Sequence, residues 1–246
     1  MKTIRSVLVF TWLIITLVPF GFGLVVCSLF LDSTKLWWWF AAPFLRGVIT
    51  AARVIGGVKY RLHGEDNLPV ADDMRRIVLC PKHQSTWETF YFASITSHPL
   101  AYVFKKELLR LPFFGWSIGR LEMIHIDRSK RSEAWKKVAE QGLEVMDKGK
   151  WVIMFPEGTR IERGKKGVYK SGATRLAVDT GAWVIPIAVT SARCWPRRSF
   201  SFRPGVIDVS IGEPIHAQGR EPGELMQEIE QWIESEMHRL DPEAYA

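Results

Sequence analysis

Short apolar segments alternate with segments of helical periodicity from residue 58 to the end of the chain. Seven runs are predicted to be strands: residues 58–62, 77–80, 101–104, 123–126, 151–155, 184–190 and 206–211. Between them, apolar residues recur at helical spacing at Trp135, Val138, Ala139, Leu143 and Met146 and at Ala173, Leu176, Ala177 and Thr180. This alternation predicts an α/β fold, with a mixed sheet covered by helices.

The last segment, residues 221–240, is predicted to be an acidic amphipathic helix. Its apolar residues are expected to face the core: Leu225, Ile229, Trp232 and Met237. With 246 residues and 47% hydrophobic content, the chain is long enough for one sizeable core. Residues 58–246 are therefore interpreted as a single globular domain.

The N-terminal segment has the length and composition of a membrane-embedded helix. Residues 7–31 carry no charge, and a helix of that length crosses a hydrocarbon layer of roughly 30 Å. Pro19, Gly21 and Gly23 interrupt the run, and basic residues stand on both sides of it. Because basic residues favour the cytoplasmic side, both ends could lie there, as in a re-entrant hairpin hinged at residues 19–23. A single crossing is the main alternative.

A cleaved signal peptide competes with this interpretation. Lys2 and Arg5 precede the apolar run, but Val26 is larger than the residue expected before a cleavage site. Residues 36–58 are apolar and aromatic, broken by Pro43, Arg46 and Arg53, and are interpreted as an interfacial amphipathic helix. Residues 1–57 are therefore expected to anchor the protein to the inner (cytoplasmic) membrane, with the domain of residues 58–246 facing the cytosol.

The net charge of +7 is compatible with a nucleic acid or with an anionic membrane surface. No zinc-finger spacing, helix-turn-helix pattern or ribonucleoprotein-type aromatic motif is present, so nucleic acid is not the expected partner. Trp37, Trp38 and Trp39 favour membrane lipids, since indole rings concentrate at headgroups and three consecutive rings cannot all face one core. The three cysteines lack disulfide or zinc spacing.

His83 is the first candidate for a catalytic base. It follows the predicted strand 77–80, and ligands of open α/β sheets bind at the carboxyl ends of strands. Ser85 and Glu88 form a capping-box pattern that predicts a helix from Thr86, so Glu88 could serve only as a cap. A histidine just before a helix can also fold back toward the first turn. The pattern therefore allows an imidazole held by the Glu88 carboxylate.

Two further segments place an arginine just after a predicted strand. They are Ile126-Asp127-Arg128 and residues 155–160, FPEGTR. Glycine lets backbone amides approach a ligand, and a guanidinium matches phosphate oxygens, so an anionic substrate group is expected here. Glu157 has the wrong charge to touch phosphate and is assigned to orienting an arginine or a substrate hydroxyl. A solvated surface turn is the alternative for FPEGTR.

Together these segments resemble the four-motif glycerolipid acyltransferase family, and most closely its bacterial 1-acylglycerol-3-phosphate (lysophosphatidic acid) acyltransferases. The resemblance rests on the order and spacing of HQSTWE, IDR, FPEGTR and VIPIAV at residues 83–88, 126–128, 155–160 and 184–189. The stretches FKKEL at 104–108, PFFGW at 112–116 and KSGA at 170–173 also fit. The chain departs from the family at Glu88, usually Asp, and at His125, usually Phe.

The resemblance implies transfer of a fatty acyl group from acyl-CoA or acyl-ACP (acyl carrier protein) to the sn-2 hydroxyl of lysophosphatidic acid. His83 would be the general base, and Glu88 would orient it. The acceptor would be held by Arg128, Glu157, Gly158, Thr159 and Arg160. Lys105 is either a further phosphate or oxyanion ligand or a surface lysine. No metal or other cofactor is expected, since the histidines lack ligand spacing.

Three alternatives remain at the level of the sequence. Another lysolipid, such as a lyso-ornithine lipid, could replace the acceptor. The protein could also be a non-catalytic membrane protein that binds anionic lipids. A covalent acyl-enzyme would need Ser85, Cys80 or Cys194 as nucleophile, but no G-x-S-x-G turn exposes one, so direct transfer is preferred.

Overall fold

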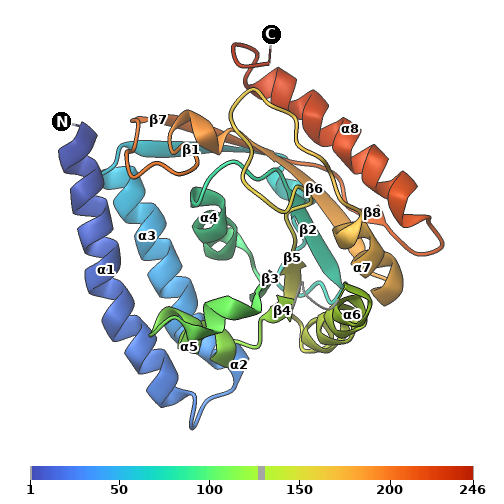
Figure 1. Cartoon of the computed structure of the whole chain (residues 1–246), viewed down its shortest axis with the longest axis horizontal. Coiled ribbons are helices and arrows are strands. Elements are labelled where there is room, and N and C mark those ends of the chain that lie inside the picture. The colour runs from blue at the N-terminus through green and yellow to red at the C-terminus, as the bar shows by residue number, and fades with distance from the viewer. Residues whose placement is uncertain (1, 127–130, 246) are drawn as a thin grey trace.

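All seven predicted strands belong to one mixed sheet in the computed structural model, which describes residues 2–126 and 131–245 (Figure 1). The strand order is β1-β7-β6-β2-β5-β3-β4. The short strand β8 pairs with the start of β6, and β7 pairs with the end of β6. The strands are β1 (Val58–His63), β2 (Ile77–Pro81), β3 (Leu100–Lys105), β4 (Ile124–Ile126), β5 (Trp151–Ile153), β6 (Trp183–Val189), β7 (Gly205–Ile211) and β8 (Ile215–His216). β8 was not predicted, because two residues are too few for a pattern.

The central strands share one direction. β6, β2, β5, β3 and β4 are parallel to one another, whereas β7 runs antiparallel to β6 and parallel to β1. The loops that follow the parallel strands therefore leave the sheet at a single edge. That edge is where an open α/β sheet places its ligand site.

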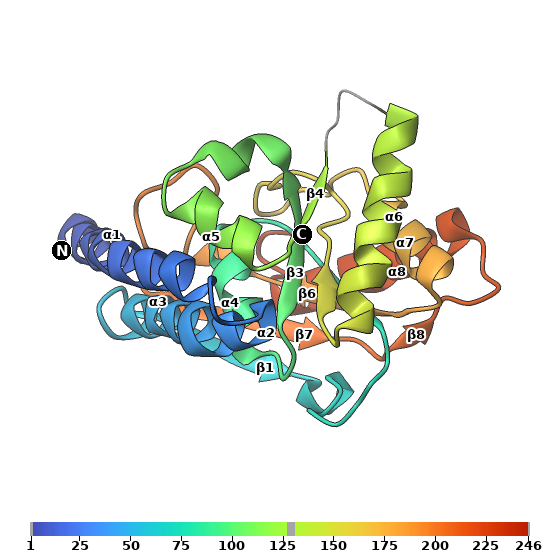
Figure 2. The same ribbon diagram turned by 90° about the horizontal axis from the view of Figure 1, so that it is seen from below.

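Helices cover both faces of the sheet (Figure 2). One face carries α1 (Lys2–Cys27), α2 (Ser33–Leu36), the π-helical turn η1 (Trp37–Ala41), α3 (Ala42–Val54), α4 (Trp87–Ile95) and α5 (Phe114–Arg120), and the other carries α6 (Arg131–Asp147), α7 (Gly172–Thr180) and α8 (Pro222–Leu240). Alternation along β2 supplies both cores: Ile77 and Leu79 face the first group, and Val78 and Cys80 face the second. The 3₁₀ turns are η2 (Glu65–Asn67), η3 (Lys106–Arg110) and η4 (Ser191–Arg193).

The N-terminal helices form a hairpin, but the predicted hinge is wrong. α1 continues through Pro19, and the chain reverses at residues 28–32 before α3 returns beside α1. The glycines serve close packing: a Cβ on Gly23 would lie 2.8 Å from the ring of Phe40. Residues Thr3–Cys27 are long and apolar enough to cross a membrane, and only 17% of their most apolar window is buried. The choice between re-entry and crossing stays a prediction.

The segment predicted as one interfacial helix is a chain of three helical pieces, and part of it belongs to the core. Val48, Ile49 and Ala52 on α3 are buried. The consecutive tryptophans do not all face one core, as expected, since Trp37 is buried and Trp39 is 68% exposed. An interfacial position for this segment stays a prediction.

Candidate active site

Four loops converge at the carboxyl edge of the parallel strands. His83 follows β2, Lys105 ends β3, residues 157–160 follow β5, and Ser191 follows β6. β2 lies between β5 and β6 in the sheet, so His83 occupies the middle of this edge. The strand order therefore brings His83, Lys105 and residues 157–160, all predicted site residues, to the same edge of the sheet. Asp127 and Arg128, after β4, lie outside the described residues.

His83 is held by Glu88 and by an aromatic ring. Its Nδ1 lies 2.5 Å from Oε2 of Glu88, whose side chain is fully buried in the first turn of α4. The imidazole also stacks on Phe155, with ring centroids 3.8 Å apart. If Nδ1 carries the proton that Glu88 accepts, the lone pair of Nε2 is left for a substrate proton. This geometry is that of a general base oriented by a carboxylate.

Glu88 is itself fixed by several donors. The backbone N–H of Ser85 donates to Oε1 at 2.9 Å, and the Ser191 hydroxyl donates to the same oxygen. The Ser85 hydroxyl in turn accepts from the backbone N–H of Trp87 at 3.1 Å. α4 begins at Trp87, one residue after the predicted start. Glu88 therefore caps the helix with one oxygen and orients His83 with the other, so the two interpretations are compatible.

Glu157 is held by two groups of the protein itself. Its side chain is fully buried, with Oε2 accepting the backbone N–H of His83 at 2.8 Å and Oε1 in an ion pair with Lys82 at 2.8 Å. Burial raises the pKa of this carboxyl, and Lys82 opposes the rise. The contacts of Glu157 in the structure are thus Lys82 and the His83 backbone, and its assignment to an arginine or a substrate hydroxyl stays a prediction. A sequence does not reveal that the neighbouring lysine turns inward and takes up its charge.

The rest of the FPEGTR loop supplies a cation to the site. Arg160 lines the cavity beside His83, and its buried Nε has no hydrogen-bond partner within residues 2–126 and 131–245. Gly158 lines the cavity with a φ of 64°, a conformation that favours glycine. Thr159 is exposed and does not line the cavity. A guanidinium whose Nε has no partner among the described residues, in the lining of the cavity that holds His83, is suited to an anionic ligand.

Two lysines add positive charge to the lining of the cavity. Lys105 is exposed and lines the cavity, and so does Lys170, which the sequence analysis gave no role. A role of Lys105 toward the phosphate or the oxyanion stays a prediction. The Lys170 Nζ lies close to Gly158, 3.5 Å from the position of an added Cβ. The signal for Lys170 was its place in the KSGA stretch, which had been given no role. Lys105, Arg160 and Lys170 therefore contribute three positive charges to the lining of the cavity that His83 also lines.

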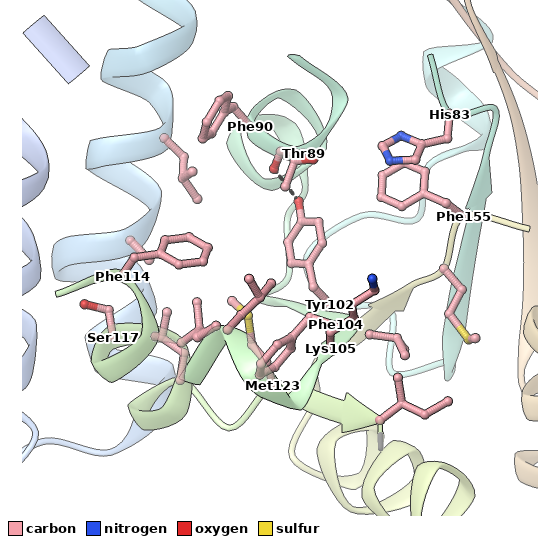
Figure 3. A pocket seen from close by; sticks show the side chains of 18 of the residues that line it. His83, Thr89, Phe90, Tyr102, Phe104, Lys105, Phe114, Ser117, Met123 and Phe155 are labelled. Carbon is pink, nitrogen blue, oxygen red and sulfur yellow. Dashed lines mark hydrogen bonds between the residues drawn. The ribbon is translucent and has the colours of Figure 1, made fainter. Parts of the chain in front are cut away.

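An apolar cavity of about 860 Å³ runs from His83 to the N-terminal helices (Figure 3). Its walls come from α1, η1, α3, α5 and the end of β3, and include Leu13, Leu17, Phe20, Leu24, Phe40, Phe44, Phe104 and Phe114. Ser117 on α5 lies on the side away from His83 (Figure 3). A cavity of this volume, lined mostly by apolar side chains and by three cationic ones, suits a molecule that has a fatty chain and a polar head.

Comparison with known proteins places the chain. Residues 59–190 match the family described as Acyltransferase. The chain belongs to the acyltransferase family. Over 200 residues this acyltransferase is 42% identical to the 1-acyl-sn-glycerol-3-phosphate acyltransferase of Pseudomonas aeruginosa, covering 80% of this chain and 76% of that one. The enzyme of that name from Saccharomyces cerevisiae is 30% identical over 87% of this chain and 69% of its own.

A solved structure shares the fold of this acyltransferase. The 1-acyl-sn-glycerophosphate acyltransferase PlsC of Thermotoga maritima superposes with a TM-score of 0.78 at 24% identity, covering 98% of each chain. The predicted mixed α/β sheet with helices and an N-terminal apolar helix is confirmed. The family likewise confirms that the protein is an enzyme, in contrast to a non-catalytic lipid binder.

The candidate nucleophiles for an acyl-enzyme are poorly suited to that role. The Ser85 hydroxyl caps α4. Burial raises the pKa of the Cys80 thiol far above its ordinary value and that of Cys194 to about 11. A thiol attacks as its thiolate, so neither cysteine is activated at neutral pH. The geometry favours direct transfer through His83.

Proposed function

We propose that this acyltransferase moves a fatty acyl group from a thioester of coenzyme A or acyl carrier protein to the sn-2 hydroxyl of 1-acylglycerol-3-phosphate, forming phosphatidic acid. One observation carries the proposal: His83, paired with Glu88, lines the same cavity as a set of apolar side chains and three cationic ones. The names of the relatives support the same acceptor. The reaction would belong to phospholipid biosynthesis.

His83 would act as a general base in one displacement. Nε2 removes the hydroxyl proton as the alcohol oxygen attacks the thioester carbonyl, and Glu88 stabilises the imidazolium that forms. The tetrahedral intermediate then expels the thiolate, which takes the proton back from His83. The new ester bond replaces the broken carbon–sulfur bond, and no external oxidant or metal enters the balance.

The acceptor phosphate would be bound by the cationic side chains that line the cavity. Arg160 offers a buried Nε without a protein partner in the described chain, and Lys170 stands beside Gly158. Lys105 would serve the phosphate or the developing oxyanion. Thr159 and Arg128 remain expected acceptor ligands. Binding the phosphate in the cavity that His83 lines would hold the sn-2 hydroxyl near Nε2.

The fatty chain would occupy the apolar cavity, whose walls include α1. The exposed apolar surface of α1 supports membrane association, since both the acceptor and the product are lipids. We place the protein at the inner membrane with its catalytic domain toward the cytosol. Coenzyme A and the carrier protein present the same thioester, so either donor fits the chemistry.

Thioester consumption by the purified full-length protein, with and without lysophosphatidic acid, tests the proposal. We expect acceptor-dependent consumption, and a loss of kcat on the order of 10² to 10⁴-fold in His83→Ala. Lysophosphatidylcholine and a lyso-ornithine lipid serve as alternative acceptors in parallel reactions. Faster consumption with either of these than with lysophosphatidic acid would reject the proposed acceptor while leaving the chemistry intact.

A further inference from the structure

A lysine ammonium group is buried directly behind the catalytic histidine. Lys82 follows β2 and precedes His83, and its side chain is 0% exposed. Its Nζ lies 2.8 Å from Oε1 of Glu157 and 2.6 Å from Oε1 of Glu234. A buried charge is retained only when it is closely paired, so the positions of these three groups depend on one another.

Glu234 brings α8 into contact with this cluster. Its side chain is 12% exposed, and the same Oε1 that pairs with Lys82 also accepts the hydroxyl of Tyr169 at 2.7 Å. The Lys82 Nζ lies 5.5 Å from the centre of the Tyr169 ring. Lys82 therefore connects three segments that are far apart in the sequence: the end of β2, the loop of residues 156–171, and α8.

The connected segments carry the groups that would perform the reaction. Glu157 accepts the His83 backbone N–H with one oxygen while the other pairs with Lys82. The loop that contains Tyr169 also contains Arg160 and Lys170, which line the cavity. A shift of the Lys82 ammonium would therefore displace the base and the acceptor ligands together.

We propose that Lys82 and Glu234 are positioning residues for acyl transfer, and that α8 holds the catalytic loop and the acceptor loop in register. Glu234 lies outside residues 59–190, the part of the chain that matches the family. The inference rests on the proposed function, because it concerns the binding of that acceptor. Neither residue lines the cavity, so both act through His83, Arg160 and Lys170.

The charges in the cluster show which variant tests it best. Removing Glu234 leaves Lys82 and Glu157 as a neutral buried pair, whereas removing Lys82 leaves two buried carboxylates without their cation. The second change threatens folding, since an unpaired buried charge is strongly destabilising. Glu234→Leu and the milder Glu234→Gln are therefore the informative variants, with Lys82→Met as a supplement.

Glu230 provides a matched control one turn earlier on α8. It pairs with Lys166 at 2.6 Å, so it joins the same helix to the same loop, but the Lys166 side chain is 60% exposed. Full-length wild type, Glu234→Leu, Glu234→Gln and Glu230→Leu are compared for kcat, for KM of lysophosphatidic acid and acyl-CoA, and for Tm. The concentration of folded protein is measured for each, so that activity is expressed per folded molecule.

We expect Glu234→Leu to lower kcat/KM for the acceptor by roughly 10 to 100-fold, the scale of a small misplacement of reacting groups. Glu234→Gln, which keeps an oxygen for Lys82, should recover part of the loss, and Glu230→Leu should stay within about 2-fold of wild type. If Glu234→Leu lowers Tm but its folded fraction keeps wild-type kinetic constants, the positioning role is rejected. A wild-type protein without acceptor-dependent turnover rejects the proposed function instead.

Discussion

At the scale of single residues, Glu88 explains why the short motif of residues 83–88 predicts a histidine held by a carboxylate. A glutamate in the first turn of a helix can reach the preceding backbone N–H groups, and this one does so with Oε1 while Oε2 meets His83. The longer side chain, compared with the aspartate usual in the family, still closes the contact at 2.5 Å. The predicted relay geometry is therefore present in the structure.

Ser191 is expected to tune this pair. Its hydroxyl donates to the Glu88 oxygen that does not contact His83, so its loss would leave the carboxylate less firmly oriented. We predict that Ser191→Ala lowers kcat about 10-fold, the scale of one hydrogen bond to a charged group, with little change in either KM. Steady-state kinetics with both substrates measures this.

Ser94→Ala is the control for that variant. The Ser94 hydroxyl donates to the carbonyl of Tyr91 within α4 and is not bonded to Glu88. Its kcat should match wild type. Equal kcat in the Ser191 and Ser94 variants would show that the contact with Ser191 has no catalytic consequence.

The residues that sequence reasoning missed share a physical cause. His83 and Arg160 are recognisable because their chemistry fits a reaction and they follow strands. Lys82 and Glu234 carry charges that usually lie on the surface, and only packing reveals that both are turned inward. Lys170 lies in the KSGA stretch, which resembles the family, and Ser191 directly follows the predicted strand 184–190. Spacing alone assigns neither side chain a partner.

At the scale of elements, one carboxylate fastens the N-terminal helices to the sheet. Glu122, between α5 and β4, accepts the Ser33 hydroxyl at 2.6 Å and pairs with Lys148 and Lys150, each at 2.9 Å. Burial opposes ionisation of this carboxyl, but the bonds from Ser33 and the two lysines outweigh it and lower its pKa to about 2. Ser33 begins α2, so these contacts fix the end of the helical hairpin.

Because the pKa of Glu122 is lower in the folded state than its ordinary value of 4.5, the stabilisation is complete above pH 4.5. It is lost as the pH falls from 4.5 toward 2. We predict that Glu122→Gln lowers Tm by about 1–3 °C near pH 7, a small effect because the side chain is partly exposed. Thermal unfolding in detergent at several pH values measures the difference.

The exposed Glu107 on η3 supplies the comparison for Glu122. Glu107→Gln should leave Tm unchanged at every pH, whereas the Glu122→Gln difference should shrink as the pH is lowered. A difference between wild type and Glu122→Gln that is independent of pH would contradict the ionic origin of the stabilisation.

The elements themselves were predictable where local pattern decides them. Every strand of the main path was found, because buried parallel strands are short runs of apolar residues bounded by turns. The continuity of α1 was not predictable in this way, since proline and glycine in a sequence suggest a break in a helix. In the structure Gly21 and Gly23 instead allow α5 and η1 to approach α1 closely.

At the scale of the whole molecule, the cavity should limit the length of the acyl chain. Ser117 lines the wall away from His83 and is largely buried, so a larger side chain there would take up part of the cavity. We predict that Ser117→Phe shifts preference toward shorter acyl-CoA substrates and lowers activity with long chains at least about 10-fold. A series of saturated acyl-CoA donors measures the preference.

Trp116→Phe is the matched change on the outer side of the same helix. Trp116 is 50% exposed and does not line the cavity, so this variant should keep the wild-type order of chain lengths. An unchanged order in Ser117→Phe, with the protein folded, would mean that the fatty chain lies elsewhere.

The walls that α1 contributes to the cavity, through Leu13, Leu17, Phe20 and Leu24, have a consequence for the leader sequence. A helix that also encloses a cavity is not interchangeable with any other apolar helix. Replacing residues 2–27 with an unrelated apolar helix would remove four apolar side chains from the wall and open the cavity to water.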